Sequence, residues 1–159
     1  MNDESVNGWM KSLNDEGAYT VDETVLNKIK SLFEAGSCDD KGTKATIADV
    51  FKKHDYLCDT HTAVAVAVYN DYAKASGDET PTVIASTANP YKFSSSVLDA
   101  LRPGMTEGMD EFDMVVALHV ETGTECPEQL ANLKGKTPRF TNCCKRENME
   151  AVVFDMLSK

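Results

Sequence analysis

The sequence lacks a long apolar run and an N-terminal leader pattern. Its longest uninterrupted apolar run, residues 63–69, has seven residues, whereas a membrane-spanning helix needs roughly 18. The acidic first residues, MNDES, contain no basic stretch of the kind that opens a signal peptide. We therefore expect no membrane partner and no secretory leader.

The sequence also has little positive charge and no regular set of cysteines. Asp and Glu number 26 against 16 Lys and Arg, which gives a formal net charge of −10. Nucleic-acid binding requires clustered Lys and Arg that neutralise phosphates, so no nucleic-acid partner is expected. The five cysteines are odd in number and irregularly spaced, which argues against a disulfide framework. A cytoplasmic location is the expectation.

What the sequence does contain is a series of helical patterns. Apolar residues three and four positions apart, as on the buried face of a helix, recur over residues 4–16, 20–35, 43–54, 90–101, 110–122 and 145–157. Thr20 and Glu23 have the spacing of a capping box. Residues 59–77 predict a further helix that is apolar all round at its start and therefore buried. Each apolar stripe is expected to face a core.

One segment, PTVIAS at residues 81–86, predicts a strand buried on both faces. A single strand of this kind would leave backbone groups unpaired on both edges, and burying such groups is costly. Its parallel neighbours must therefore come from elsewhere. We expect an α/β class for the whole protein, of which this chain is a part separated from its sheet.

Two motifs resemble consecutive motifs in the C-terminal part of threonine synthase. They are DTHTAVAVAVYNDY, residues 59–72, and TVIASTANPYKFSSSVLDAL, residues 82–101. Residues 19–40 and 137–157 are also similar to the family in type and order. The resemblance implies a pyridoxal phosphate (PLP)-dependent lyase that converts O-phospho-L-homoserine and water into L-threonine and phosphate.

The resemblance also implies what this chain lacks. It implies the fold-type-II PLP fold, with the cofactor between two α/β domains, and this chain is then a helix-rich C-terminal fragment with few strands of its own. The family's Schiff-base lysine, in a Phe-Lys-Asp motif, and its phosphate-cradling glycine-rich loop do not occur here. We therefore expect no cofactor and no activity in the isolated chain, and the missing N-terminal part as its partner.

The whole chain, residues 1–159, is expected to form a single unit with three segments. Residues 1–57 are a helical segment, residues 58–103 hold a buried helix, a strand and a helix of the cofactor domain, and residues 104–159 are a C-terminal helical segment. The alternative is a stand-alone, non-catalytic binding or regulatory module derived from the enzyme, which would have to cover the edges of the predicted strand by other means.

The resemblance implies that a Ser or Thr hydroxyl at the end of the strand faces the pyridine nitrogen of the cofactor. Thr87 is the first candidate and Ser86 the second. The alternative is that both hydroxyls only bond to nearby backbone, as they commonly do at strand ends. Lys92 follows the family pattern and could approach the substrate phosphate, or it could be an ordinary exposed lysine. No catalytic residue is expected on this chain.

Three further positions have structural explanations beside functional ones. His61 could face the substrate or be a structural histidine. Asn89 stands where many family members carry a histidine, and the helix cap is its simpler role. His54, Cys58 and His61 resemble a metal triplet, but a zinc site needs converging ligands. Their spacing crosses a predicted helix end and a loop, so no metal is expected.

Overall fold

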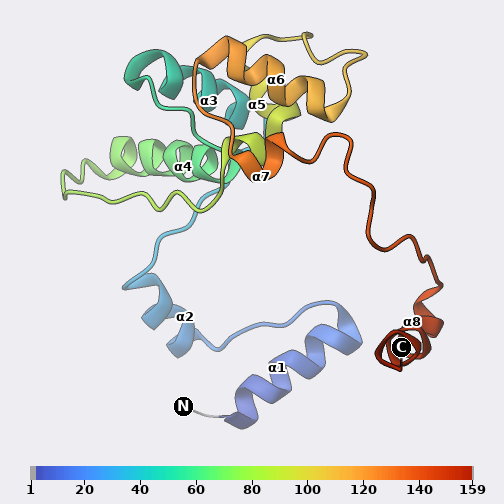
Figure 1. The fold of residues 1–159 in the computed structure, drawn as a ribbon. Coiled ribbons are helices and arrows are strands. Elements are labelled where there is room, and N and C mark those ends of the chain that lie inside the picture. Colours follow the sequence, from blue (N-terminus) through green and yellow to red (C-terminus); the bar gives the residue numbers. More distant parts are fainter. Residues whose placement is uncertain (1–2, 159) are drawn as a thin grey trace.

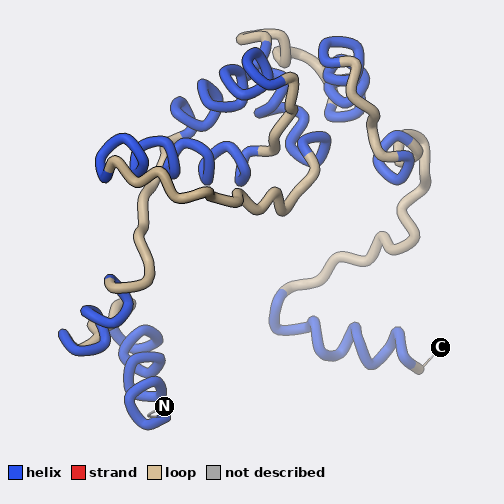
Figure 2. The backbone as a smooth tube through the Cα atoms, turned by 90° about the vertical axis from the view of Figure 1, so that its left-hand side faces the viewer, coloured by secondary structure: helices blue, strands red, loops and turns tan. Residues whose placement is uncertain are grey.

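The computed structural model describes residues 3–158, and every regular element in that range is a helix (Figures 1 and 2). Within this range no helix is both long enough and apolar enough to cross a membrane. The elements are α1 (Asp3–Glu16), α2 (Glu23–Lys30), α3 (Asp40–His54), α4 (Thr60–Ser76), the 3-10 turn η1 (Pro90–Phe93), α5 (Ser94–Leu101), α6 (Glu111–Thr122), α7 (Glu128–Ala131), the 3-10 turn η2 (Arg146–Asn148) and α8 (Met149–Leu157).

Aspartates cap the starts of the longer helices. Asp39 accepts a hydrogen bond from the Gly42 N–H at the start of α3, and Asp110 accepts one from the Asp113 N–H at the start of α6. Such carboxylates satisfy N–H groups that have no partner within the helix. The predicted capping box at Thr20 is wrong, because Asp22 caps α2 instead. Asp is a stronger cap than Thr, so the helix begins later than predicted.

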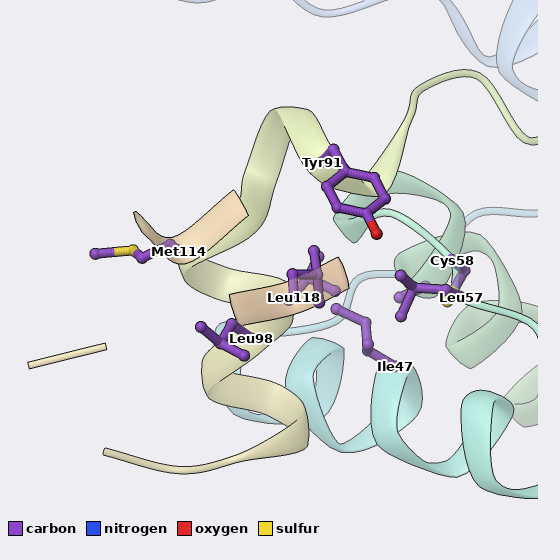
Figure 3. Packing of buried hydrophobic residues seen from close by; sticks show 9 residues of the cluster. Ile47, Leu57, Cys58, Tyr91, Leu98, Met114 and Leu118 are labelled. Atoms are coloured by element: carbon purple, nitrogen blue, oxygen red, sulfur yellow. The ribbon is translucent and has the colours of Figure 1, made fainter. Parts of the chain in front are cut away.

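Helices α3 to α6 enclose the core. Helix α3 packs against α4 and α5, and α5 packs against α6, while Leu130 of α7 packs against the core. Figure 3 shows apolar side chains from these elements converging on one cluster. The buried members of this cluster are Ile47, Leu57, Cys58, Ala63, Tyr91, Val97, Leu98, Met114 and Leu118.

Helix α4 is less buried than its composition predicts. Its first turn contributes the buried Thr62 and Ala63, but the rest of the helix is half-buried or exposed. Gly36 approaches it closely: a Cβ atom at Gly36 would lie 2.7 Å from Cγ1 of Val68. The prediction of a buried helix therefore holds for the first turn of α4 and is wrong for the rest of it, where an apolar surface remains open.

The predicted strand at residues 81–86 does not form within the described part of the chain. After Gly77 the chain turns back and runs beside α4 as an extended segment (Figures 1 and 2). Val83 in this segment is 94% exposed. A strand requires a neighbour to accept and donate its backbone hydrogen bonds, and residues 3–158 supply none. The chain is helix-rich, and the α/β class is not seen in it.

Helices α1, α2 and α8 lie away from this core (Figures 1 and 2). Their apolar stripes, which the sequence predicts to be buried, are largely exposed: Leu32, just beyond α2, is 80% exposed, and Leu157 in α8 is 77% exposed. Trp9 and Tyr19 stack on each other, with ring centroids 6.3 Å apart. The three helices therefore form without the apolar cover that usually stabilises amphipathic helices.

Candidate functional site

The candidate site is built on the start of α4. Asp59 caps this helix: its Oδ1 accepts hydrogen bonds from the backbone N–H of His61 at 2.8 Å and of Thr62 at 3.3 Å. The Thr62 hydroxyl donates to Oδ2 of the same carboxylate in a short hydrogen bond. Asp59 is 0% exposed and Thr62 is 4% exposed. A buried charge thus has several donors, as a buried carboxylate requires.

Ser86 joins this cap from the extended segment. Its Oγ lies 3.2 Å from Oγ1 of Thr62 and 3.1 Å from the hydroxyl of Tyr56. Tyr56, Ser86, Thr62 and Asp59 therefore form a continuous chain of side-chain hydrogen bonds, which we call the hydroxyl chain. It connects the loop before α4, the start of α4 and the end of the extended segment.

The surroundings set the charge state of the two buried groups. Burial acts to raise the pKa of Asp59, but the hydrogen bonds from the Thr62 hydroxyl and from the N–H groups of His61 and Thr62 outweigh it, so the pKa lies below its ordinary value. Burial raises the pKa of the neighbouring Cys58 thiol, and the Asp59 charge adds to this rise. Cys58 is therefore a neutral packing group.

Thr87 follows Ser86 directly and differs from it in its contacts. Thr87 is exposed, and within the described residues its hydroxyl has no hydrogen bond. The alternative explanation, that both hydroxyls bond to nearby backbone, does not apply to Ser86, which bonds to side chains that lie 24 and 30 positions away. A role for either residue in cofactor binding stays a prediction.

The structure does not bring His61 or Lys92 into this hydroxyl chain. The exposed His61 ring has its Nδ1 3.3 Å from Oδ1 of Asp59 and its centroid 5.0 Å from that of Phe93. His61 lines an open pocket of about 490 Å³ together with Lys44 and Phe93. Lys92 is exposed on η1 and lines a different pocket, of about 260 Å³, beside α6. Their assignment to substrate also stays a prediction.

The structure bears on two further expectations, the Asn89 cap and the absence of a metal site at His54, Cys58 and His61. As predicted, Asn89 caps η1 by accepting a hydrogen bond from the Tyr91 N–H at 3.0 Å, and Pro90 takes the first position of this turn. The described residues contain no group of three or more His, Cys, Asp or Glu side chains placed to hold a metal ion. His54, Cys58 and His61 therefore do not converge.

Sequence reasoning missed two members of the site, Tyr56 and Thr62, and gave Asp59 only the role of a cap. Thr62 lies three residues after Asp59, which is a spacing that allows a side-chain contact at a helix start. That spacing could have indicated the pair. Tyr56 carries no such local signal, because its contact with Ser86 spans 30 positions.

Comparison with known proteins connects this arrangement to one family. The family described as "Threonine synthase, C-terminal" matches residues 62–153. The chain is 31% identical to the threonine synthase of Eremothecium gossypii over 101 residues, which are 60% of this chain and 20% of that protein. The threonine synthase of Saccharomyces cerevisiae is 31% identical over 104 residues, which are 62% of this chain and 20% of that protein.

A solved structure shows the same relationship. A PLP-bound threonine synthase from Brucella melitensis aligns with a TM-score of 0.55 and 33% identity, over 71% of this chain and 24% of that chain. The chain thus spans about a fifth of the length of the two curated threonine synthases. Since the family match covers more than half of the 159 residues, this chain belongs to the threonine synthase C-terminal domain family.

Proposed function

We propose that this chain works as part of a PLP-dependent threonine synthase, in which it supplies the residues beside the cofactor's pyridine nitrogen. The reaction is the conversion of O-phospho-L-homoserine and water into L-threonine and phosphate. The observation that carries the proposal is the Ser86–Thr87 pair, which lies within the family match and whose Ser86 is linked through Thr62 to the buried carboxylate of Asp59. The names of the relatives support the substrate and the cofactor.

The residues present fit one side of this cofactor. A pyridine nitrogen needs a single donor or acceptor beside it, and the exposed Thr87 hydroxyl uses neither capacity within the described part of the chain. The other requirements, a lysine that bonds to the cofactor and a loop of backbone N–H groups for its phosphate, have no counterpart in this chain's motifs. The residues of this chain therefore fit the pyridine edge of the cofactor and not its phosphate or its lysine-bonded carbon.

The proposed contribution of this chain is electrostatic tuning. PLP supplies an electron-withdrawing ring, and its hydrogen-bond partner at the ring nitrogen sets how strongly the ring withdraws electrons. A neutral hydroxyl such as that of Thr87 does not hold the ring nitrogen as a cation, whereas a carboxylate in its place would. Asp59 is linked to Ser86 through Thr62, but its Oδ1 accepts from the N–H groups of His61 and Thr62 and its Oδ2 accepts from the Thr62 hydroxyl.

The isolated chain is proposed to be inactive, because the bond-making lysine and the phosphate loop belong to another part of the enzyme. The exposed apolar faces of α1, α2 and α8 and the unpaired segment at residues 81–86 support a partner of this kind. All five cysteines are free thiols, which supports the proposed cytoplasmic location.

The test of the Thr87 assignment is a reconstituted enzyme. The Brucella melitensis threonine synthase, with the region that matches this chain removed, is mixed with this chain and with PLP. Thr87→Ala should lower kcat roughly 2- to 10-fold, because a hydrogen bond between neutral groups contributes about 0.5–1.5 kcal/mol. The PLP dissociation constant should change less, because the phosphate and lysine contacts lie on the other part.

The matched control is Thr82→Ala. Thr82 is an exposed threonine of the same segment whose hydroxyl, among residues 3–158, bonds only to the carbonyl of Thr80. We expect kcat to stay at the wild-type value in this variant. An unchanged kcat in Thr87→Ala would show that Thr87 is not the partner of the ring nitrogen.

A further inference from the structure

The hydroxyl chain converges on Ser86 from two sides. The Thr62 hydroxyl shares its single proton between Oγ of Ser86, at 3.2 Å, and Oδ2 of Asp59. The Tyr56 hydroxyl donates to the same Ser86 oxygen at 3.1 Å. Ser86 is therefore the acceptor in both contacts, and Thr62 links it to the buried carboxylate of Asp59.

These contacts distinguish two adjacent hydroxyls. The oxygen of Ser86 accepts two hydrogen bonds inside the protein, whereas the hydroxyl of Thr87 has no hydrogen bond among the described residues.

The same contacts tie the extended segment to the body of the protein. Within the described chain, residues 81–88 make no backbone–backbone hydrogen bonds, and Val83 is almost fully exposed. Ser86 is bonded to Thr62, a buried residue in the first turn of α4. A segment without a sheet partner is thus fixed, immediately before Thr87, by a side-chain anchor.

We propose that Asp59 and Thr62 are positioning residues: they hold Ser86 at the start of α4 and so set the place of Thr87. The carboxylate orients the Thr62 hydroxyl, this hydroxyl hydrogen-bonds to the Ser86 oxygen, and the backbone of the next residue is fixed as a result. The role assigned to Thr87 rests on the proposed function, whereas the anchoring of Ser86 does not. The two are therefore tested separately.

The experiment measures backbone order in the isotopically labelled 159-residue chain, without cofactor, by NMR relaxation. In the wild type the amides of residues 85–87 should have order parameters near about 0.85, the value of a rigid backbone. In Thr62→Val, which keeps the shape but removes the hydroxyl, they should fall below about 0.6, the range of flexible segments. Thr62→Ser keeps the hydroxyl and should restore the wild-type values.

Two further variants separate anchoring from damage to α4. Ser86→Ala removes the other end of the anchor from an exposed position and should reproduce the fall seen in Thr62→Val. Thr60→Val, in the same turn of α4, removes a hydroxyl that has no contact with Ser86 and should leave residues 85–87 unchanged. In all four variants the amides of residues 64–68, inside α4, should keep their wild-type order.

Three results would overturn the proposal. One is a flexible backbone at residues 85–87 in the wild type, and another is wild-type order at these residues in Ser86→Ala. The third is an equal loss of order in Thr62→Ser and Thr62→Val, which would show that packing, not the hydroxyl, holds the segment. None of these measurements depends on PLP, so the Thr87 assignment can fail while the anchoring holds.

Discussion

At the scale of single residues, Asp59 has two roles at the start of α4. It satisfies the first N–H groups of α4 and it accepts the hydroxyl proton of Thr62. Its cap could be predicted from the sequence, because a cap depends on neighbours in the chain. The part of the hydroxyl chain that runs through Ser86 and Tyr56 could not be predicted from the sequence, because these contacts depend on how distant segments fold together.

Asp59→Ala should therefore destabilise the chain. Loss of a helix cap costs about 0.5–2 kcal/mol, and the buried Thr62 hydroxyl would lose its acceptor as well, so we expect a value in the upper half of that range. Urea unfolding followed by circular dichroism measures the change. Asp22→Ala is the control, because Asp22 caps the outlying α2, and it should change the free energy of core unfolding by much less.

The depressed pKa of Asp59 predicts a pH dependence of a definite sign. A carboxylate whose pKa is lower in the folded chain than in the unfolded chain, where it is about 3.9, stabilises the fold at pH values above the unfolded pKa. This contribution is lost as the pH falls through the folded pKa. The stability difference between wild type and Asp59→Asn should thus be constant near neutral pH and shrink in acid.

Urea unfolding of both proteins at a series of pH values between about 7 and 3 measures this difference, and the range spans the ordinary Asp pKa. Comparing the two proteins cancels the titration of other carboxylates with lowered pKa, such as Asp99 and Asp110. A difference that grows as the pH falls would contradict the assigned charge state.

At the scale of elements, local signals predict the helices and fail for the strand. Apolar spacing and capping aspartates lie within a few residues of each other, so the bounds of α1, α3, α4 and α6 were predicted closely. The segment at residues 81–86 has the composition of a strand but stays extended and unpaired. The composition of this segment suits a position between neighbouring strands, and the described residues contain no such strands.

The close approach of Gly36 to α4 gives a prediction about an element's packing. Gly36→Ala would place a Cβ atom 2.7 Å from the branched side chain of Val68, and overpacking of this kind typically costs about 1–3 kcal/mol. In contrast, Gly8 lies within α1 with no atom near its Cβ position. Gly8→Ala should raise the helix content, because Ala exceeds Gly in helix propensity by about 1 kcal/mol.

Circular dichroism and urea unfolding of the two variants distinguish these effects. We expect Gly36→Ala to lower the urea midpoint of the core and Gly8→Ala to leave that midpoint unchanged while increasing the helical signal. An unchanged midpoint in Gly36→Ala would mean that the segment before α3 does not pack on α4 in solution.

At the scale of the whole molecule, the chain has one small core and several apolar faces without partners. Leu118 in α6 is 0% exposed, whereas Leu32 is 80% exposed. The sequence pattern predicted that both would be buried in the complete protein. Only the coordinates show which apolar stripes meet within this chain, because a stripe indicates a buried face but not the element that covers it.

The contrast between these two leucines predicts opposite results for the same substitution. Leu118→Ala should cost about 2–5 kcal/mol, since it removes buried methyl groups and leaves a cavity. Leu32→Ala should change the free energy of unfolding by less than about 0.5 kcal/mol, as for other exposed positions. Urea unfolding of the isolated chain measures both, and a large loss in Leu32→Ala would show that this residue packs against the chain itself.

The central claim is that this chain completes a threonine synthase and does not catalyse alone. It is tested by measuring phosphate release from O-phospho-L-homoserine, with PLP present, in three samples. The samples are this chain, the Brucella melitensis enzyme lacking the matching region, and the two mixed. The claim predicts release above background in the mixture alone. Release by the isolated chain, or a mixture as inactive as its parts, would contradict it.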